Sequence, residues 1–315
     1  MKIIFFGTPD FVLPVLKALY RTYGKGEEGV VAVVTQSPKE AGRKRYVERS
    51  AVDNWGFKHN VPVVYDLSSL PTANLGVVAA YGKLIPDNII KEFDAGMLNI
   101  HPSLLPSFRG ASPIQASIAT GTTNTGVSII KMDEQMDHGP VLTQFKYYLE
   151  ETDTNETVRT KVFEAIAPVL IELIPNYLSQ KITLKQQDHG KASFTRIIRK
   201  EDGYIAGKFL TAALAGMESD EDWQIPFIKN SADGTPIKIN HPLAQNIYNY
   251  FRALTPWPGV WTMVNLTVDK QCRLKILTCH IENDKLVLDE VQLEGKQEVT
   301  WKQFVEGHPQ YSFEG

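Results

Sequence analysis

The first half of the chain alternates between short apolar runs and segments with apolar residues every three or four positions. The apolar, often β-branched runs predict strands, and the segments with helical spacing predict helices. Strands are expected at residues 2–6, 30–34, 61–64, 76–80, 97–100 and 125–132, and helices at residues 11–20 and 50–57. Uninterrupted apolar strands separated by helices indicate a parallel sheet buried on both faces. The first half is therefore predicted to be an α/β domain.

A longer helical pattern follows this domain. Residues 152–155 supply N-cap candidates, and apolar residues then recur with helical spacing from Val158 to Leu173. Pro168 and Pro175 lie inside the pattern, so a kink or an early end is expected. Residues 179–205 are polar and basic, which predicts a connection between domains.

The last third has a different pattern. A helix is expected at residues 243–254, followed by a rigid Pro-containing turn at residues 255–259. Short alternating segments at residues 260–268, 273–281, 285–293 and 297–304 predict a small β-barrel. The predicted domains are residues 1–180, a linker at 181–205, and a barrel-like domain at 206–315. Residues 216–239 are acidic and contain a tryptophan, and we expect them to be an insertion in that domain.

Composition and charge narrow the class of protein. The apolar run at residues 3–6 is too short for a membrane span, and no other run approaches about 18 apolar residues, so a cytoplasmic protein is expected. Cys272 and Cys279 cannot form a disulfide framework and do not have zinc-ligand spacing, so both are expected to be interior residues. The net charge is −3, and residues 206–315 carry 10 Lys and Arg against 14 Asp and Glu. A nucleic-acid-binding surface is therefore not evident from the totals.

Three polar residues stand out as candidates for chemistry. Asn99 and His101 have the same parity on a predicted strand, so their side chains share a face at its end. An amide donor beside an imidazole suits acyl transfer, because one can stabilise an oxyanion while the other handles a proton. Asp137 follows the next predicted strand, and its carboxylate could orient His101. A structural histidine and a turn aspartate explain the same residues, so both interpretations stay open on this evidence.

The tract Gly7-Thr8-Pro9-Asp10 follows the first predicted strand and raises the question of a nicotinamide cofactor. It lacks the G-x-G-x-x-G pattern that lets a backbone approach a pyrophosphate closely. A structural turn is the better interpretation.

Several longer tracts resemble the folate-dependent formyltransferases. The strongest is LNIHPSLLPSFRGASPI at residues 98–114, and TGVSIIKMDEQMDHGPVL at 125–142 and MKIIFFGTPDFVLPVLKAL at 1–19 also resemble the family. The resemblance implies a Rossmann-like parallel-sheet domain and direct acyl transfer from 10-formyltetrahydrofolate. Asn99 and His101 would stabilise the tetrahedral oxyanion, His101 would help protonate the leaving nitrogen, and Asp137 would tune His101 and assist proton removal from the amine. The resemblance also implies a folate pocket lined by Ala80, Tyr81, Leu84, Ile85, Ser103, Leu104, Leu105 and Pro106.

Other tracts resemble the branch of this family that formylates Met-tRNA. They are ASFTRIIRKEDGYI at residues 192–205, IYNYFRALTPWPGVWT at 247–262 and EVTWKQFVEGHP at 298–309. The implied partner is the acceptor arm of initiator Met-tRNA, bound by an OB-like barrel. The loop containing Ala41-Gly42-Arg43-Lys44 resembles one that lies near the end of the acceptor stem, although the glycine usual after its arginine is missing. The expected tRNA contacts are Arg43, Lys44, Arg45, Lys191 and Arg196, with Lys181, Lys185, Arg199 and Lys200 as further phosphate candidates.

Three other functions fit parts of the sequence. An amino-sugar nucleotide N-formyltransferase would use the same chemistry, but the Pro256-Trp257-Pro258-Gly259 region disfavours it. A catalytically silent RNA-binding protein would have no physical need for Asn99, His101 and Asp137 together, and a folate hydrolase would not need the last domain. No metal site, no membrane association and a monomeric state are expected.

Overall fold

The structure is a computed structural model that describes residues 1–25, 28–41, 46–229, 237, 239, 241–267 and 270–314. The chain divides into two compact units. The first comprises Met1–Gly110, Thr125–Tyr148 and Arg159–Ala192, and the second comprises Ala111–Asn124, Leu149–Val158 and Ser193–Gly315. Two short segments from the first half of the chain therefore belong to the second unit. The predicted domain boundaries stay a prediction.

The first unit is built on a seven-stranded sheet with the order β10-β9-β7-β6-β1-β2-β5. The strands are β1 (Lys2–Gly7), β2 (Gly29–Val34), β5 (Val63–Val64), β6 (Leu75–Ala79), β7 (Met97–His101), β9 (Asn124–Lys131) and β10 (Val141–Tyr148). Five adjacent strands of this sheet, in the order β7-β6-β1-β2-β5, run parallel to one another. Their apolar residues are almost fully buried, as in Ile3, Phe5, Val33 and Leu98. The predicted Rossmann-like parallel sheet is confirmed.

Strand β9 does not continue the parallel sheet as predicted. It runs antiparallel to β7, with Leu98 opposite Lys131 and His101 opposite Ser128. A strand buried on both faces has the same apolar run in either direction, so its sequence carries no signal for direction. The loop after β9 therefore leaves the sheet beside the start of β7. At the end of this loop, the carbonyl of Pro140 accepts a hydrogen bond from the Lys131 amide at 3.0 Å.

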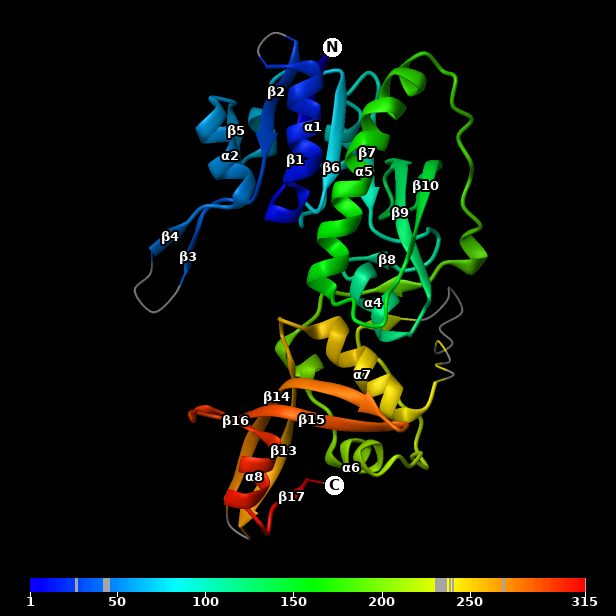
Figure 1. Ribbon diagram of the computed structural model, residues 1–315. Helices are drawn as coiled ribbons and strands as arrows, with labels where there is room; N and C mark the ends of the chain where they lie inside the picture. The colour runs from blue at the N-terminus through cyan, green and yellow to red at the C-terminus, as the bar shows by residue number, and fades with distance from the viewer. Residues whose placement is uncertain are drawn as a thin grey trace. The chain divides into compact units, whose positions relative to one another are not determined.

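Helices α1 (Leu13–Tyr23) and α5 (Asn155–Leu178) lie over the same face of this sheet (Figure 1). Helix α2 (Ala51–His59) begins where the Ser50 side chain accepts a hydrogen bond from the Asp53 amide. The sequence predicted a kink or an early end at Pro168 and Pro175. Helix α5 continues through both, so the early end is wrong. Its buried residues, which include Val162, Phe163, Ile166, Leu170 and Ile174, stabilise the helix and outweigh the two missing amide donors.

The remaining elements of the first unit are short. They are the 3₁₀ helices η1 (Asp10–Val12), η2 (Leu67–Ser69) and η3 (His189–Lys191), the helix α3 (Asp87–Ile90), the antiparallel strands β3 (Lys39–Ala41) and β4 (Tyr46–Glu48), and the strand β8 (Arg109–Gly110). None of the helices among the described residues has the length and apolar content that a membrane span needs.

The second unit contains a separate antiparallel sheet with the order β16-β15-β14-β13-β17. Its strands are β13 (Val260–Thr267), β14 (Lys270–Glu282), β15 (Lys285–Leu293), β16 (Glu298–Thr300) and β17 (Ser312–Phe313). The other elements of this unit are α4 (Pro113–Ala119), β11 (Phe194–Thr195), η4 (Lys200–Gly203), α6 (Gly207–Ala215), β12 (Ile228–Lys229), α7 (Leu243–Leu254) and α8 (Trp301–Gly307). Where the sequence predicted a small β-barrel after the parallel-sheet domain, the structure has this separate antiparallel sheet, and α7 has the predicted bounds.

Two local predictions in this unit need correction. Residues 297–304 form a strand only to Thr300, where a capping box with Gln303 starts α8: the Gln303 amide donates to Thr300 Oγ1 at 3.2 Å, and the Thr300 amide donates to Gln303 Oε1 at 3.0 Å. Cys279 is buried as expected, but Cys272 is partly exposed. The acidic stretch 216–239 lies partly outside the described residues, and within it Trp223 packs edge-on against Tyr250 at 5.3 Å.

Candidate active site

Asn99, His101 and Asp137 lie together in the first unit. The Asn99 side chain donates from Nδ2 to Asp137 Oδ1 at 3.1 Å, and Nδ1 of His101 lies 3.5 Å from the same oxygen. The His101 and Asp137 side chains are 5% and 11% exposed, so bulk water screens their interaction only weakly. The structure therefore brings together the three residues that the sequence singled out.

The carboxylate of Asp137 is held from two sides. Oδ1 accepts from Asn99, and Oδ2 accepts from the backbone amide of Gly110 at 2.7 Å. The backbone of Asp137 has a φ of 52°, in the left-handed region that a residue with a side chain rarely adopts. Such a conformation persists only where the surroundings determine it strongly, and it is frequent at functional sites.

The ring of His101 has a defined hydrogen-bonding pattern. Nε2 lies 3.0 Å from the carbonyl oxygen of Phe108, which can only accept, so Nε2 carries a proton and donates it. Nδ1 faces Asp137 and is the position at which the ring can accept or hold a second proton. Asp137 thus adjoins the ring atom that can change its protonation.

A second layer of polar residues surrounds the loop that carries Asp137. Arg109, which is 4% exposed, donates to Gln187 Oε1 and lies 2.8 Å from Nδ1 of His189. The His189 ring stacks on His138 with centroids 3.9 Å apart, and His138 pairs with Asp133 at 2.7 Å. Burial, then the charges of His138 and Arg109, lower the pKa of His189, which agrees with a neutral ring that accepts from Arg109.

The residues expected to line a folate pocket follow two neighbouring strands. Ala80, Tyr81, Leu84 and Ile85 come after β6, and Ser103, Leu104, Leu105 and Pro106 come after β7, whose carboxyl ends share one edge of the sheet. The first segment is fixed at the Tyr81 carbonyl, which accepts from Thr8 and Gln36. The second is fixed at Leu105, whose amide donates to Ser128 and whose carbonyl accepts from Gln144. Leu84 is 81% exposed and Leu105 is 5% exposed.

The expected RNA contacts have varied positions. Arg43, Lys44 and Arg45 lie outside the described residues. Lys191 is exposed and pairs with Asp188 at 3.0 Å. The guanidinium of Arg196 makes a bidentate ion pair with the Asp202 carboxylate, with N–O distances of 2.7 and 2.6 Å, so it already has a partner within the protein. Lys181, Lys185, Arg199 and Lys200 are exposed. The proposed RNA contacts of these residues stay predictions.

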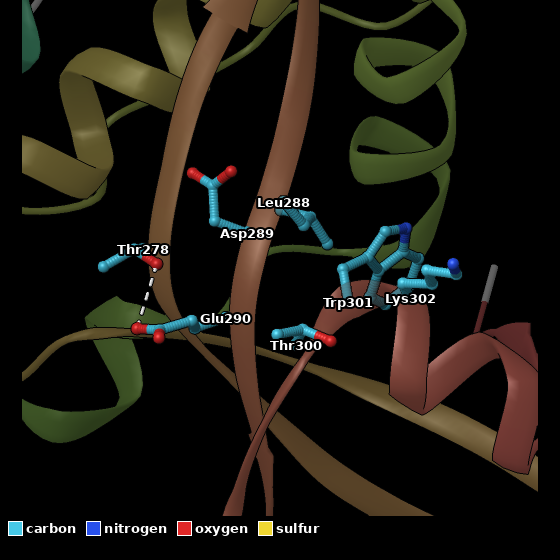
Figure 2. A pocket seen from close by; sticks show the side chains of 7 residues that line it. All are labelled: Thr278, Leu288, Asp289, Glu290, Thr300, Trp301 and Lys302. Carbon is cyan, nitrogen blue, oxygen red and sulfur yellow. Dashed lines mark hydrogen bonds between the residues drawn. The ribbon is translucent and has the colours of Figure 1, made fainter.

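A hollow of about 670 Å³ lies on the second unit, next to the sheet and the start of α8 (Figure 2). Asp289, Glu290, Trp301 and Lys302 line it, together with Thr278, which donates to Glu290 at 3.3 Å. Asp289 and Glu290 supply two carboxylates and Lys302 one ammonium group, so the hollow would repel a phosphate group. This hollow contains none of the three candidate catalytic residues.

Metal ligands are the remaining possibility. Among the residues that the structure describes, no group of three or more His, Cys, Asp or Glu side chains is arranged to hold a metal ion. The expectation of metal-independent chemistry stays a prediction.

The candidate site lies in the unit with the mostly parallel α/β sheet, and the second unit has an antiparallel sheet of its own. Residues 1–174 match the formyl transferase family, and residues 237–286 match the formyl transferase C-terminal domain. The chain belongs to the formyl transferase family and is an enzyme of that class.

The relatives with similar sequences carry a more specific name. The methionyl-tRNA formyltransferase of Chloroflexus aurantiacus (strain ATCC 29366 / DSM 635 / J-10-fl) is 34% identical over 272 residues, which are 83% of this chain and 76% of the relative. That of Geobacillus sp. (strain WCH70) is 34% identical over 274 residues, 83% of this chain and 74% of the relative.

Solved structures share the fold at lower identity. The methionyl-tRNA formyltransferase from Clostridium thermocellum has a TM-score of 0.55 and 18% identity, with 93% of this chain and 98% of that chain covered. The N-formyltransferase from Helicobacter canadensis, in complex with folinic acid and dTDP-3-aminofucose, has a TM-score of 0.59 and 12% identity, with 93% and 95% covered. At these identities the likeness concerns the fold alone.

Proposed function

We propose that this enzyme transfers the formyl group of 10-formyltetrahydrofolate to the amino group of methionyl-tRNA, with initiator tRNA as the acceptor. The observation that carries the chemistry is the Asp137 carboxylate, bonded to Asn99 and facing His101. The acceptor is inferred from relatives named methionyl-tRNA formyltransferase, which match 83% of the chain.

Asn99 is proposed to stabilise negative charge on the formyl oxygen. Its Nδ2 carries two hydrogens, and the bond to Asp137 uses one of them. The second is the proposed donor to the developing oxyanion. Because Asp137 fixes the amide plane before the donor binds, this stabilisation needs little reorganisation during the reaction.

His101 and Asp137 are proposed to handle protons. The Phe108 carbonyl holds the Nε2 proton of His101, so a proton destined for the leaving nitrogen would be held on Nδ1, beside Asp137. Asp137 would accept the proton that the attacking amine loses, directly or through water. The two proton-transfer atoms would be Nδ1 of His101 and Oδ1 of Asp137, which lie 3.5 Å apart.

The formyl donor is proposed to bind between the segments after β6 and β7. The donor supplies an activated formyl group on N10, and backbone groups of the two segments would orient its pterin ring. The hydrogen bonds of the Tyr81 carbonyl and the Leu105 amide support this proposal, because they fix the backbone that would contact the ring. Holding the donor and the amine in one geometry would supply a large part of the rate acceleration.

The acceptor is the finer part of the proposal. Solved structures of both methionyl-tRNA and sugar formyltransferases share this fold, so the fold does not separate the two acceptors. The acidic hollow of the second unit disfavours that surface as a phosphate contact. The proposed contacts are instead the basic residues of 181–200 and the loop containing Arg43.

The test is formyl transfer from 10-formyltetrahydrofolate to three acceptors in parallel: initiator Met-tRNA, elongator Met-tRNA and a dTDP-linked amino sugar. Product on initiator Met-tRNA supports the proposal, and its ratio to the elongator product measures selection between the tRNAs. Transfer to the sugar alone would refute the tRNA proposal and leave the roles of Asn99, His101 and Asp137 intact.

A further inference from the structure

Gln187 is a buried polar residue that the proposed chemistry does not use. It lies between α5 and η3, in the polar tract that the sequence predicts to be a connection, yet it is only 7% exposed. Glutamine is seldom buried unless its amide is fully hydrogen-bonded. The partners of Gln187 therefore indicate what it does.

Both ends of the Gln187 amide are occupied. Nε2 donates to the carbonyl oxygen of Asp137 at 2.9 Å and to that of Gly139 at 2.8 Å. Oε1 accepts from Nε and Nη2 of Arg109 at 3.2 and 2.7 Å. A guanidinium can only donate and a carbonyl can only accept, so the chemistry of the partners fixes which end of the amide faces which group.

Arg109 connects this amide to the candidate active site through its own chain neighbours. The carbonyl of Phe108 accepts from His101, and the amide of Gly110 donates to the Asp137 carboxylate. Gln187 thus joins the backbone of Asp137 to the segment that fixes both His101 and the Asp137 side chain. The hydrogen bond from Gln187 to the Asp137 carbonyl joins residues 50 positions apart in the sequence.

The backbone of Asp137 needs such support. Its left-handed conformation is unfavourable for a residue with a side chain, and the surroundings must hold it. Gly110 and Asn99 hold the carboxylate, whereas Gln187 holds the carbonyl of the same residue and that of Gly139. Without the amide of Gln187, the loop carbonyls would lose both donors and the carboxylate would shift relative to Asn99 and His101.

We propose that Gln187 is a positioning residue that sets the location of the Asp137 carboxylate relative to Asn99 and His101. The proposal rests on the proposed role of Asp137 in formyl transfer. Gln187 acts through the Asp137 backbone and contacts none of the reacting groups.

The first test compares Gln187→Glu with Gln187→Met. The glutamate keeps an acceptor for Arg109 but removes both donors to the loop carbonyls, and the methionine removes donor and acceptor without adding charge. Each variant should lower kcat roughly 10- to 100-fold, because a small displacement of a catalytic group has effects of that size. The KM for the formyl donor should change by less than about threefold, because neither variant alters the segments that are proposed to bind the donor.

Gln186→Glu is the matched control, since Gln186 is the exposed neighbour and should keep the wild-type kcat. A kcat within about threefold of wild type in folded Gln187→Met would overturn the proposal. A loss of kcat that only follows a loss of folded protein, measured by circular dichroism, would also overturn it. If Gln187→Glu does not fold, Gln187→Met decides the question.

A readout without turnover separates this proposal from the proposed function. The ¹⁵N chemical shifts of the His101 ring report the charge near Nδ1, and they should change in Gln187→Met but not in Gln186→Glu. Unchanged His101 shifts in Gln187→Met would refute the positioning role, whichever acceptor the enzyme uses. If Asp137→Asn keeps the wild-type rate, the proposed role of Asp137 fails, and shifted His101 signals would still support the structural link through Gln187.

Discussion

The backbone amide of Gly110 donates to Oδ2 of Asp137 at 2.7 Å, so the segment after β7 fixes a carboxylate on the loop after β9. The other oxygen of the same carboxylate accepts from Asn99 and faces His101. Both carboxylate oxygens thus accept a hydrogen bond, Oδ1 from the Asn99 side chain and Oδ2 from the Gly110 amide. Asp137 is therefore the residue around which the candidate site is organised.

Asp137→Asn should lower the rate of formyl transfer by roughly 10²-fold if this carboxylate moves a proton. An amide of the same shape cannot accept at both positions, so it also loses the bond to Asn99 or to Gly110. Single-turnover formyl transfer measures the effect, and Asp94→Asn is the control, because Asp94 is an exposed carboxylate in the same unit. Wild-type turnover in Asp137→Asn would remove this carboxylate from the mechanism.

Gly139→Ala should disrupt the loop that carries Asp137. A Cβ atom at Gly139 would lie 1.8 Å from the carbonyl oxygen of Lys131, a backbone atom that cannot move aside without displacing β9. We expect a lower melting temperature and a loss of activity of at least roughly tenfold. Gly190→Ala is the control, because a Cβ atom there meets only Asp188 Oδ1 at an ordinary 3.5 Å. Equal melting temperatures and activities in the two variants would contradict the steric argument.

The apolar run at residues 97–100 predicted the strand that bears Asn99 and His101, and parity along a strand predicted that both side chains share one face. It could not predict the direction of β9, since a strand buried on both faces has the same apolar pattern in a parallel or an antiparallel neighbour. It also missed Gln187, whose bonds to Asp137 and Arg109 span 50 and 78 positions and leave no local signal. Local periodicity predicts elements, whereas contacts across the chain complete the site.

The pair of Arg196 and Asp202 should make the second unit sensitive to acid. Burial alone would raise the pKa of Asp202, but hydrogen bonds from Arg196 and the Arg199 amide outweigh it and hold that pKa below the ordinary 3.8. A carboxyl whose pKa is lower in the folded state stabilises the fold above its unfolded pKa. That contribution is lost as the pH falls through the folded value.

Asp202→Asn should therefore be less stable than wild type near neutral pH, and the difference should shrink as the pH falls below 3.8. Urea unfolding at a series of pH values measures this difference. Asp220→Asn, at an exposed carboxylate in the same unit, should show no such dependence. A stability difference that is independent of pH would mean that the charge of Asp202 does not contribute.

Arg252→Met should destabilise the second unit, because Arg252 is a buried cation on α7 that joins two segments distant in sequence. Its Nη1 donates to the carbonyl of Asp153 at 2.7 Å and to that of Glu150 at 3.2 Å, and Nη2 donates to Asn249 at 2.7 Å. Arg252 is only 7% exposed, so methionine would leave buried acceptors without these donors. A loss of about 3 kcal/mol is expected, since each unsatisfied buried group costs about 1–3 kcal/mol.

Tryptophan fluorescence during urea unfolding measures this loss, because Trp223, Trp257, Trp261 and Trp301 all belong to the second unit. The control is Arg273→Met, at an exposed arginine stacked over the Trp261 ring at 4.2 Å, where a loss of no more than about 1 kcal/mol is expected. Similar losses in the two variants would show that the carbonyl contacts of Arg252 add nothing to its apolar packing. A much larger loss in Arg252→Met would show that the hydrogen bonds from Arg252 to the carbonyls of Glu150 and Asp153 stabilise the second unit.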